Sequence, residues 1–126
     1  MSISDQDKEA AINFLELASS GKVREAYSKY VGEGFKHHNP YFEGSADALE
    51  AGMQENADQN PEKSLEVKHA IAEGDLVAVH SLVHHKRGDR GAAVIHIFRF
   101  ENGRIVELWD VGQEVPENSP NEYGMF

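Results

Sequence analysis

Hydrophobic residues follow helical spacing in the first half of the chain. Apolar positions such as Ala11, Phe14, Leu15 and Ala18 recur every three or four residues, as on one face of a helix. Serine and aspartate at the starts and glycine at an end are typical helix boundaries. Three helices are expected: from Ser4 or Asp5 to Gly21, over residues 23–30, and from a Ser45 cap to about Asn60.

The second half alternates between apolar and polar residues, which is typical of strands. Four strands are expected, over residues 65–71, 76–85, 92–100 and 104–111, with turns at 73–75, 87–91 and 101–103. Residues 112–126 are rich in Pro and Asn and are expected to form an extended tail. Helices followed by an antiparallel meander predict one α+β domain over residues 1–126, in which a curved sheet covered by helices leaves room for a pocket.

The segment "IVELWDV" raises the question of where Asp110 points, because a carboxylate in a half-buried strand needs a partner or water. A three-residue loop at 101–103 would pair Phe100 with Arg104 and set His96 diagonal to Asp110. A two-residue turn would instead set His96 opposite Trp109. We favour the three-residue loop because it places most apolar side chains on one face and brings Arg99 near Glu107 on the other.

In the favoured register one face is apolar apart from two polar groups. It holds Val94, His96, Phe98, Leu108 and Asp110. The opposite face holds Ile95, Ile97, Arg99, Glu107 and Trp109, and lets Arg99 pair with Glu107. Asp110 is thus expected in a pocket beside an imidazole, where a shielded carboxylate can transfer protons near neutral pH. A solvent-facing Asp at a strand end explains the spacing equally well.

Seven histidines suggest a metal site, but their spacing does not favour one. The adjacent pairs His37-His38 and His84-His85 would point to opposite faces of a strand, and no HExxH motif is present. His80 shares a face with Ala78 and Leu82, and either face of that strand could be the inner one. His38 stands before "NPY", at a potential pocket mouth, where a turn histidine bonded to backbone is as good an explanation as a functional one.

Charge and composition exclude several functions. The net charge of −10 opposes binding to nucleic acid and to anionic membranes. The apolar runs are too short to span a bilayer, and the chain has neither cysteine nor an N-terminal targeting signal. A cytoplasmic protein is the default expectation.

Several stretches resemble the SnoaL-like polyketide cyclase branch of the nuclear transport factor 2-like superfamily. They are "HHNPYFEG", "AEGDLVAVHS", "DRGAAVIHIFRFENGRIVELWDV" and the terminal "GMF", and the resemblance covers about residues 8–126. It implies a cone-shaped α+β barrel (nuclear transport factor 2-like or cystatin-like), with a curved antiparallel sheet and N-terminal helices on its concave side. It also implies a deep pocket, a homodimer, and cofactor-free acid–base chemistry on small hydrophobic carbonyl compounds.

Two residues depart from the relatives. His96 stands where the related ketosteroid isomerases, as we read the resemblance, carry an acid that stabilises an oxyanion. Gln113 stands where many cyclases have a carboxylate, which leaves Asp110 as a candidate replacement.

The leading hypothesis is a cofactor-independent cyclase, isomerase or lyase without a metal. Asp110, His96 and His38 are the expected catalytic residues, and the expected substrate-binding residues are Asn39, Tyr41, His80, Phe98 and Leu108. One rival is a non-catalytic dimeric protein that binds a hydrophobic ligand. Another is a metal-assisted hydrolase, which needs at least three of His38, His80, His96 and Asp110 around one point.

Overall fold

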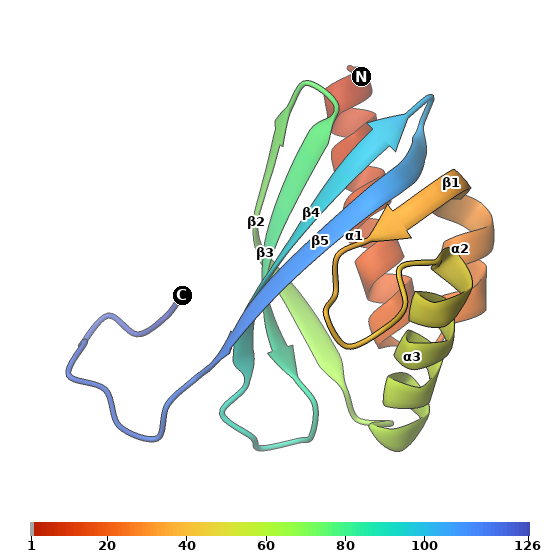
Figure 1. The fold of residues 1–126 in the computed structure, drawn as a ribbon. Coiled ribbons are helices and arrows are strands. Elements are labelled where there is room, and N and C mark those ends of the chain that lie inside the picture. The colour runs from red at the N-terminus through yellow and green to blue at the C-terminus, as the bar shows by residue number, and fades with distance from the viewer. Residues whose placement is uncertain (1) are drawn as a thin grey trace.

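The computed structural model describes residues 2–126, with helices and strands in the order that Figure 1 labels. The helices are α1 (Ile3–Ser19), α2 (Val23–Tyr30) and α3 (Ala46–Gln59). The strands are β1 (Val31–His37), β2 (Ser64–Glu73), β3 (Leu76–His84), β4 (Ala92–Glu101) and β5 (Arg104–Glu114). In the described part of the chain no helix is long and apolar enough to cross a membrane.

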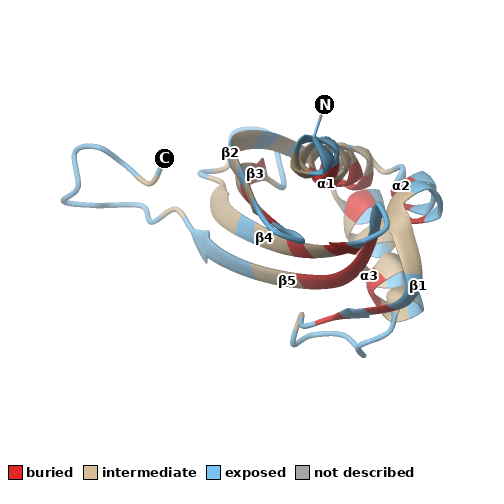
Figure 2. Ribbon diagram, turned by 90° about the horizontal axis from the view of Figure 1, so that it is seen from above, coloured by how far each residue is buried: buried red, intermediate tan, exposed pale blue. Residues whose placement is uncertain are grey.

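The five strands form one sheet in the order β1-β5-β4-β3-β2. Its four C-terminal strands are the expected antiparallel meander. The sheet curves without closing, and the helices pack against its concave side (Figures 1 and 2). The α+β class with helices inside the curve is therefore confirmed, as an open sheet.

The strand β1 was missed by the sequence analysis. It pairs in parallel with β5 at the sheet edge and follows α2 without an intervening loop. Its sequence "VGEGFKH" holds two glycines and a glutamate, which are all uncommon in strands. Only its last part alternates clearly, with Phe35 and His37 buried and Lys36 exposed.

The helix boundaries depend on local capping. The hydroxyl of Ser2, rather than Ser4 or Asp5, caps α1 by accepting a hydrogen bond from the Asp5 amide at 3.1 Å. Ser45 caps α3 as expected, through the amide of Ala48 at 3.2 Å. Ser2 was overlooked because several residues near the start are good caps.

The core lies between α1, α2 and the concave sheet face. Phe14 of α1 and Phe98 of β4 are fully buried and meet edge to face, with ring centroids 5.9 Å apart. Val77 and Val79 of β3 are also buried, so this face of β3 is the inner one. The residues that alternate with these valines, Ala78, His80 and Leu82, therefore face outward.

The hairpin between β4 and β5 has a different register from the predicted one, but the same residues lie on each face of the sheet. Asn102 and Gly103 both have positive φ (51° and 78°), as in a type I′ turn, so Glu101 pairs with Arg104. The predicted three-residue loop was wrong. A bulge beside Arg99 then shifts the pairing by one residue.

Beyond the bulge, Arg99 lies opposite Glu107, at 3.0 Å between Nε and Oε1, and His96 lies opposite Asp110. His96 and Asp110 are therefore direct cross-strand neighbours, closer than the expected diagonal arrangement. The bulge was invisible to pattern reasoning because Ile105 and Val106 are both apolar and both buried.

The strand β5 continues to Glu114, three residues beyond the expected end, and its last residues are exposed (Figure 2). The irregular tail therefore starts at residue 115 rather than 112. The last residue, Phe126, returns to the convex face of the sheet and stacks on His80, with ring centroids 5.7 Å apart.

Candidate active-site pocket

A two-compartment pocket lies between the concave face of the sheet and α3. The larger compartment, of about 270 Å³, is lined by residues of the β1–α3 loop, α3, β4 and β5, Asp110 and His96 among them. The smaller compartment, of about 140 Å³, is lined mainly by apolar residues of α1 and the sheet. Both are lined by Met53, Lys63, His85 and His96, so the two compartments are adjacent.

Asp110 faces this pocket, as predicted, and is held by Asn39. The Asn39 Nδ2 donates to both carboxylate oxygens of Asp110, at 3.0 and 3.3 Å. The Asn39 Oδ1 in turn accepts from the backbone amide of Tyr41 at 3.0 Å, which fixes the amide orientation. Within residues 2–126 no backbone amide and no basic side chain bonds to Asp110, so the carboxylate is oriented without being neutralised.

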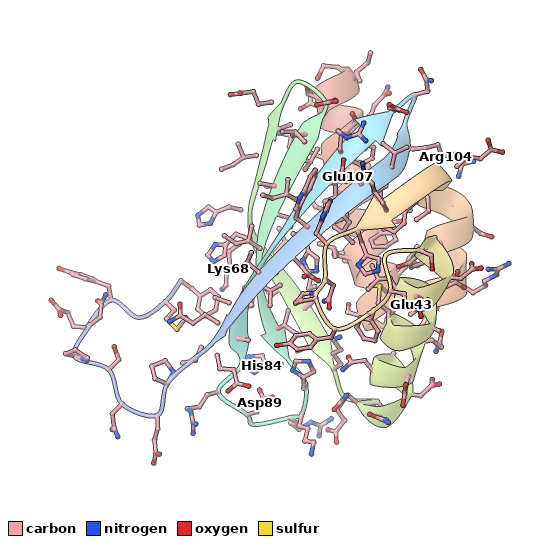
Figure 3. All side chains as sticks on the ribbon, in the orientation of Figure 1. Glu43, Lys68, His84, Asp89, Arg104 and Glu107 are labelled. Atoms are coloured by element: carbon pink, nitrogen blue, oxygen red, sulfur yellow. The ribbon has the colours of Figure 1, made fainter. Side chains whose placement is uncertain are left out.

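His37, which the sequence analysis did not select, fixes the loop that carries Asn39. Its ring is buried, its Nε2 lies 2.5 Å from the carbonyl oxygen of Glu43, and its Nδ1 accepts from the Asn39 amide at 3.0 Å. Glu43 lies in the loop between β1 and α3 (Figure 3). The missed strand explains the omission, because only the alternation along β1 places His37 inward.

His96 lies opposite Asp110 on the same pocket wall. Burial lowers the pKa of His96 to about 4; Asp110 opposes this shift and Lys63 adds to it. His96 is therefore a neutral imidazole at pH 7. Its buried Nδ1 has no hydrogen-bond partner among the described residues, so the ring has hydrogen-bonding capacity to offer a ligand.

Leu108 and Phe42 supply apolar wall in the larger compartment. Phe42 packs on α3 where Gly52 leaves room; a Cβ at Gly52 would overlap the Phe42 ring. Leu108 was predicted as a wall residue, but Phe42 was not. Tyr41, which was predicted, is 85% exposed and does not line the pocket.

Phe98 lies beneath the pocket floor rather than in its lining. Its ring is fully buried and packs against Phe14, Phe100 and the ring of His96. It supports His96 from the core and is not among the lining residues that a substrate would contact.

Two predicted histidines lie on the convex face of the sheet instead. The Nε2 of His38 is 2.6 Å from Oε2 of Glu107, and its ring stacks on Trp109 at 5.0 Å. Figure 3 labels Glu107 on β5. His80 stacks on His69, with ring centroids 5.3 Å apart and Nδ1 atoms 3.0 Å apart. Strand alternation takes both rings away from the pocket, so the structure does not place His38 or His80 where their expected catalytic and substrate-binding roles would put them.

The same geometry excludes the ligand set of the metal-assisted hydrolase. His38 and His80 lie on one face of the sheet and His96 and Asp110 on the other, so three of them do not converge. Within residues 2–126 no group of three His, Asp or Glu side chains is arranged to hold a metal ion.

Lys63 and His85 complete the pocket and were not selected from the sequence. Lys63 follows α3, and its Nζ donates to Oδ1 of Asn56 at 2.6 Å. His85 continues the inward alternation of β3 at the pocket mouth. Burial lowers the pKa of both side chains, and Lys63 adds to the effect on His85. The inward face of Val79 and Val83 was the available signal for His85.

A protein family with a matching sequence model can now be assigned to this chain. The model of the SnoaL-like domain matches residues 11–108, which is most of the chain and includes α2, α3 and the sheet up to Leu108. The chain belongs to the SnoaL-like domain family. The matched range ends two residues before Asp110, so the match does not reach the pocket carboxylate. No curated protein matches this SnoaL-like chain.

Solved structures share the fold of this SnoaL-like protein at low identity. AclR from Streptomyces galilaeus, provisionally assigned as a hydroxylase, has 22% identity and a TM-score of 0.74 over 87% of this chain and 90% of its own. A protein from Jannaschia, provisionally assigned as a SnoaL-like polyketide cyclase, has 14% identity and a TM-score of 0.75 over 90% and 89%. One from Acidithiobacillus ferrooxidans, provisionally assigned as a polyketide cyclase, has 22% identity and a TM-score of 0.69 over 90% and 92%.

Proposed function

We propose that this SnoaL-like protein is a cofactor-independent acid–base enzyme, of the cyclase, isomerase or lyase type, that acts on a small hydrophobic carbonyl compound. The observation that carries the proposal is the direct pairing of His96 and Asp110 on the wall of the pocket. Asp110 is oriented by Asn39 while its charge has no counter-ion. A carboxylate and a neutral imidazole side by side are suited to forming an enolate.

In this mechanism Asp110 removes a proton from the carbon next to the substrate carbonyl. The C–H bond breaks, the proton goes to the carboxylate, and the electron pair moves onto the carbonyl oxygen as an enolate. His96, which is neutral, donates an N–H hydrogen bond to that oxygen. The enolate then either takes the proton back at another carbon or attacks a second carbonyl of the same molecule, as in an aldol ring closure. In the ring closure a C–C bond forms, the C=O π electrons move onto the second carbonyl oxygen, and the resulting alkoxide takes the proton from Asp110.

Asn39 is a positioning residue in this scheme. Its amide holds both oxygens of Asp110 and is itself fixed by the backbone of the β1–α3 loop. This arrangement limits the rotation of the carboxylate, so that less ordering is needed when the substrate binds.

The first test needs no knowledge of the natural substrate. We expect the protein to catalyse exchange of α-protons for deuterium in small cyclic and aromatic ketones, such as 1-tetralone, in D₂O, because enolate formation is common to all three reaction types. Proton NMR measures the loss of the α-proton signals. Ketones that bind without any accelerated exchange would contradict the enzyme and support the rival ligand-binding protein.

We also propose that the protein is a homodimer formed through the convex sheet face. Ile95 and Val111 on this face are 42% and 71% exposed, beside Ile97 and Trp109. Exposed apolar patches of this kind usually mark interfaces. Light scattering at micromolar concentration should give twice the mass of the 14.0 kDa chain.

Ile95→Glu should convert that dimer to a monomer, because the interface would have to bury an unpaired charge. Ile3→Glu is the matched control, since Ile3 is 74% exposed on α1, away from the sheet face. A monomeric wild-type protein, or an Ile95→Glu dimer, would contradict this interface.

A further inference from the structure

Lys63 is a half-buried cation in the pocket and has no carboxylate partner. Within residues 2–126 the lysines with ion pairs are Lys8, Lys36 and Lys68, which pair with Asp5, Glu107 and Glu66. The remaining lysines, apart from Lys63, are exposed on the surface and can be solvated by water. Within residues 2–126 Lys63 has no counter-ion, and its side chain is only partly exposed.

Within residues 2–126 the ammonium group of Lys63 donates to a single protein acceptor. An ammonium has three N–H donors, and only Oδ1 of Asn56 accepts one, at 2.6 Å. The nearby C-terminal end of α3 favours a cation, but this effect is small and does not supply an acceptor. A desolvated charge of this kind is costly unless another group pairs with it.

The position of Lys63 determines what that group could be. Lys63 lines both compartments, as do His85 and His96, whereas Asp110 lines the larger compartment alone. A ligand in the larger compartment is therefore enclosed by a wall that holds both Asp110 and Lys63. His96 adds an unpartnered buried Nδ1 on the same wall.

We infer that Lys63 and Asn56 form an anion subsite, and that the substrate is a keto acid whose carboxylate binds Lys63 while its carbonyl lies between His96 and Asp110. This inference rests on the proposed function and specifies its substrate class. The carboxylate supplies the missing acceptors of the ammonium, and the apolar body of the substrate fits the aliphatic lining of the smaller compartment. The lowered pKa of Lys63 agrees with a desolvated amine that an anion would stabilise in its charged form.

The overall electrostatic potential of the protein cannot produce a preference for an acid over a neutral ligand. The net charge of −10 repels anions, so any selective binding of an acid must come from a local cation. The ionisable side chains that line the pocket are Lys63, His85, His96 and Asp110. At pH 8 the two histidines are neutral, so Lys63 is the pocket side chain that a bound anion can stabilise in its positively charged form.

Calorimetric titration at pH 8 and 0.15 M salt tests the subsite with two probes that share one ketone frame: 4-oxo-4-phenylbutanoate and its primary amide. We expect the acid to bind at least about tenfold more tightly than the amide, because a charge-assisted hydrogen bond is lost in the amide complex. Lys63→Met keeps the aliphatic stem and should abolish the preference. Lys63→Arg should retain part of it.

Lys86→Met is the matched control. Lys86 is exposed on the turn after β3, so its removal changes the net charge equally without touching the pocket, and the preference should remain. Equal affinities for acid and amide in the wild-type protein, no binding of either, or an unchanged preference in Lys63→Met would each overturn the subsite. Thermal melts of all variants verify folding.

The outcome separates this inference from the proposed function. Tight, acid-selective binding without α-proton exchange would support the anion subsite and contradict the proposed enzymatic function. Exchange of neutral ketones with no acid preference would keep the enzyme and contradict the subsite.

Discussion

Asp110→Asn should lower the rate of enzyme-catalysed α-proton exchange by on the order of 10²–10⁴-fold, the usual contribution of a general base. The substitution preserves the shape of the side chain and removes the group that takes the proton. One oxygen of the new amide can still accept from Nδ2 of Asn39, so the geometry of the β1–α3 loop is retained. NMR exchange assays on both proteins, with the same ketone, measure the ratio.

The melting temperature of the Asp110→Asn protein separates catalysis from structure. Asn39 is a side-chain donor, and no backbone amide within residues 2–126 depends on Asp110. We therefore expect the melting temperature to stay unchanged or to rise, because an unpaired carboxylate in the pocket is removed. A loss of about 1–3 kcal/mol of stability would instead identify Asp110 as a structural residue. Glu107→Gln is a useful comparison on the same strand, since Glu107 pairs with Arg99 and His38, so this variant should be destabilised.

The second large effect concerns stability in acid. His96 has a pKa of about 4 in the folded protein, against about 6.5 in the unfolded chain. Between these values the unfolded chain binds a proton that the folded protein does not, so stability is lost as the pH falls from 6.5 towards 4. We expect a loss from His96 of roughly 2 kcal/mol by pH 4.5, discounted because the pocket leaves the ring partly accessible. Urea unfolding at pH 7 and pH 4.5 measures it.

His96→Gln isolates this contribution from the carboxylates that titrate in the same range. Glu107 and Asp89 have lowered pKa values because histidines and other donors bond to them, and their stabilisation is lost at still lower pH. The variant keeps those groups and should lose less stability between pH 7 and pH 4.5 than the wild-type protein. Equal losses in the two proteins would show that His96 is protonated without penalty, and hence is not a desolvated pocket group.

The sequence was sufficient for the class of fold and for the inner face of the hairpin. Alternation along β3 and β4 and the three helical patterns predicted the main elements, and the apolar character of Phe98 and Leu108 identified the face of His96 and Asp110. These features follow from burial, which acts residue by residue and leaves a periodic trace. The turn chemistry of Asn102-Gly103 was also readable, although the three-residue alternative was preferred.

The missing parts depend on contacts between distant segments. The edge strand β1 is stabilised by pairing with β5 rather than by its own propensity, and His37, His38 and Asn39 are placed by that pairing. Lys63 reaches the pocket because α3 ends beside β2, which no local pattern encodes. His38 and His80 were assigned to the pocket because a histidine pattern carries no information about which face is inner until one neighbour is known to be buried.

The bulge in β5 determines which face of the hairpin would change if the pairing of β4 and β5 slipped by one residue. If the turn at Asn102-Gly103 were kept but the bulge removed by a slip of one residue, His96 would lie opposite Trp109, and Glu107 would take an inward place opposite Phe98. Such a chain would keep a hairpin of nearly the same length, but Glu107 and Trp109 would take the places of Leu108 and Asp110 on the pocket face. Burying Glu107 without Arg99 and His38 is costly. The ion pairs of Glu107 on the convex face therefore disfavour the shifted register and stabilise the one that forms the pocket on the opposite face. The pairing register that forms the site therefore depends on Glu107, Arg99 and His38, which lie outside the pocket.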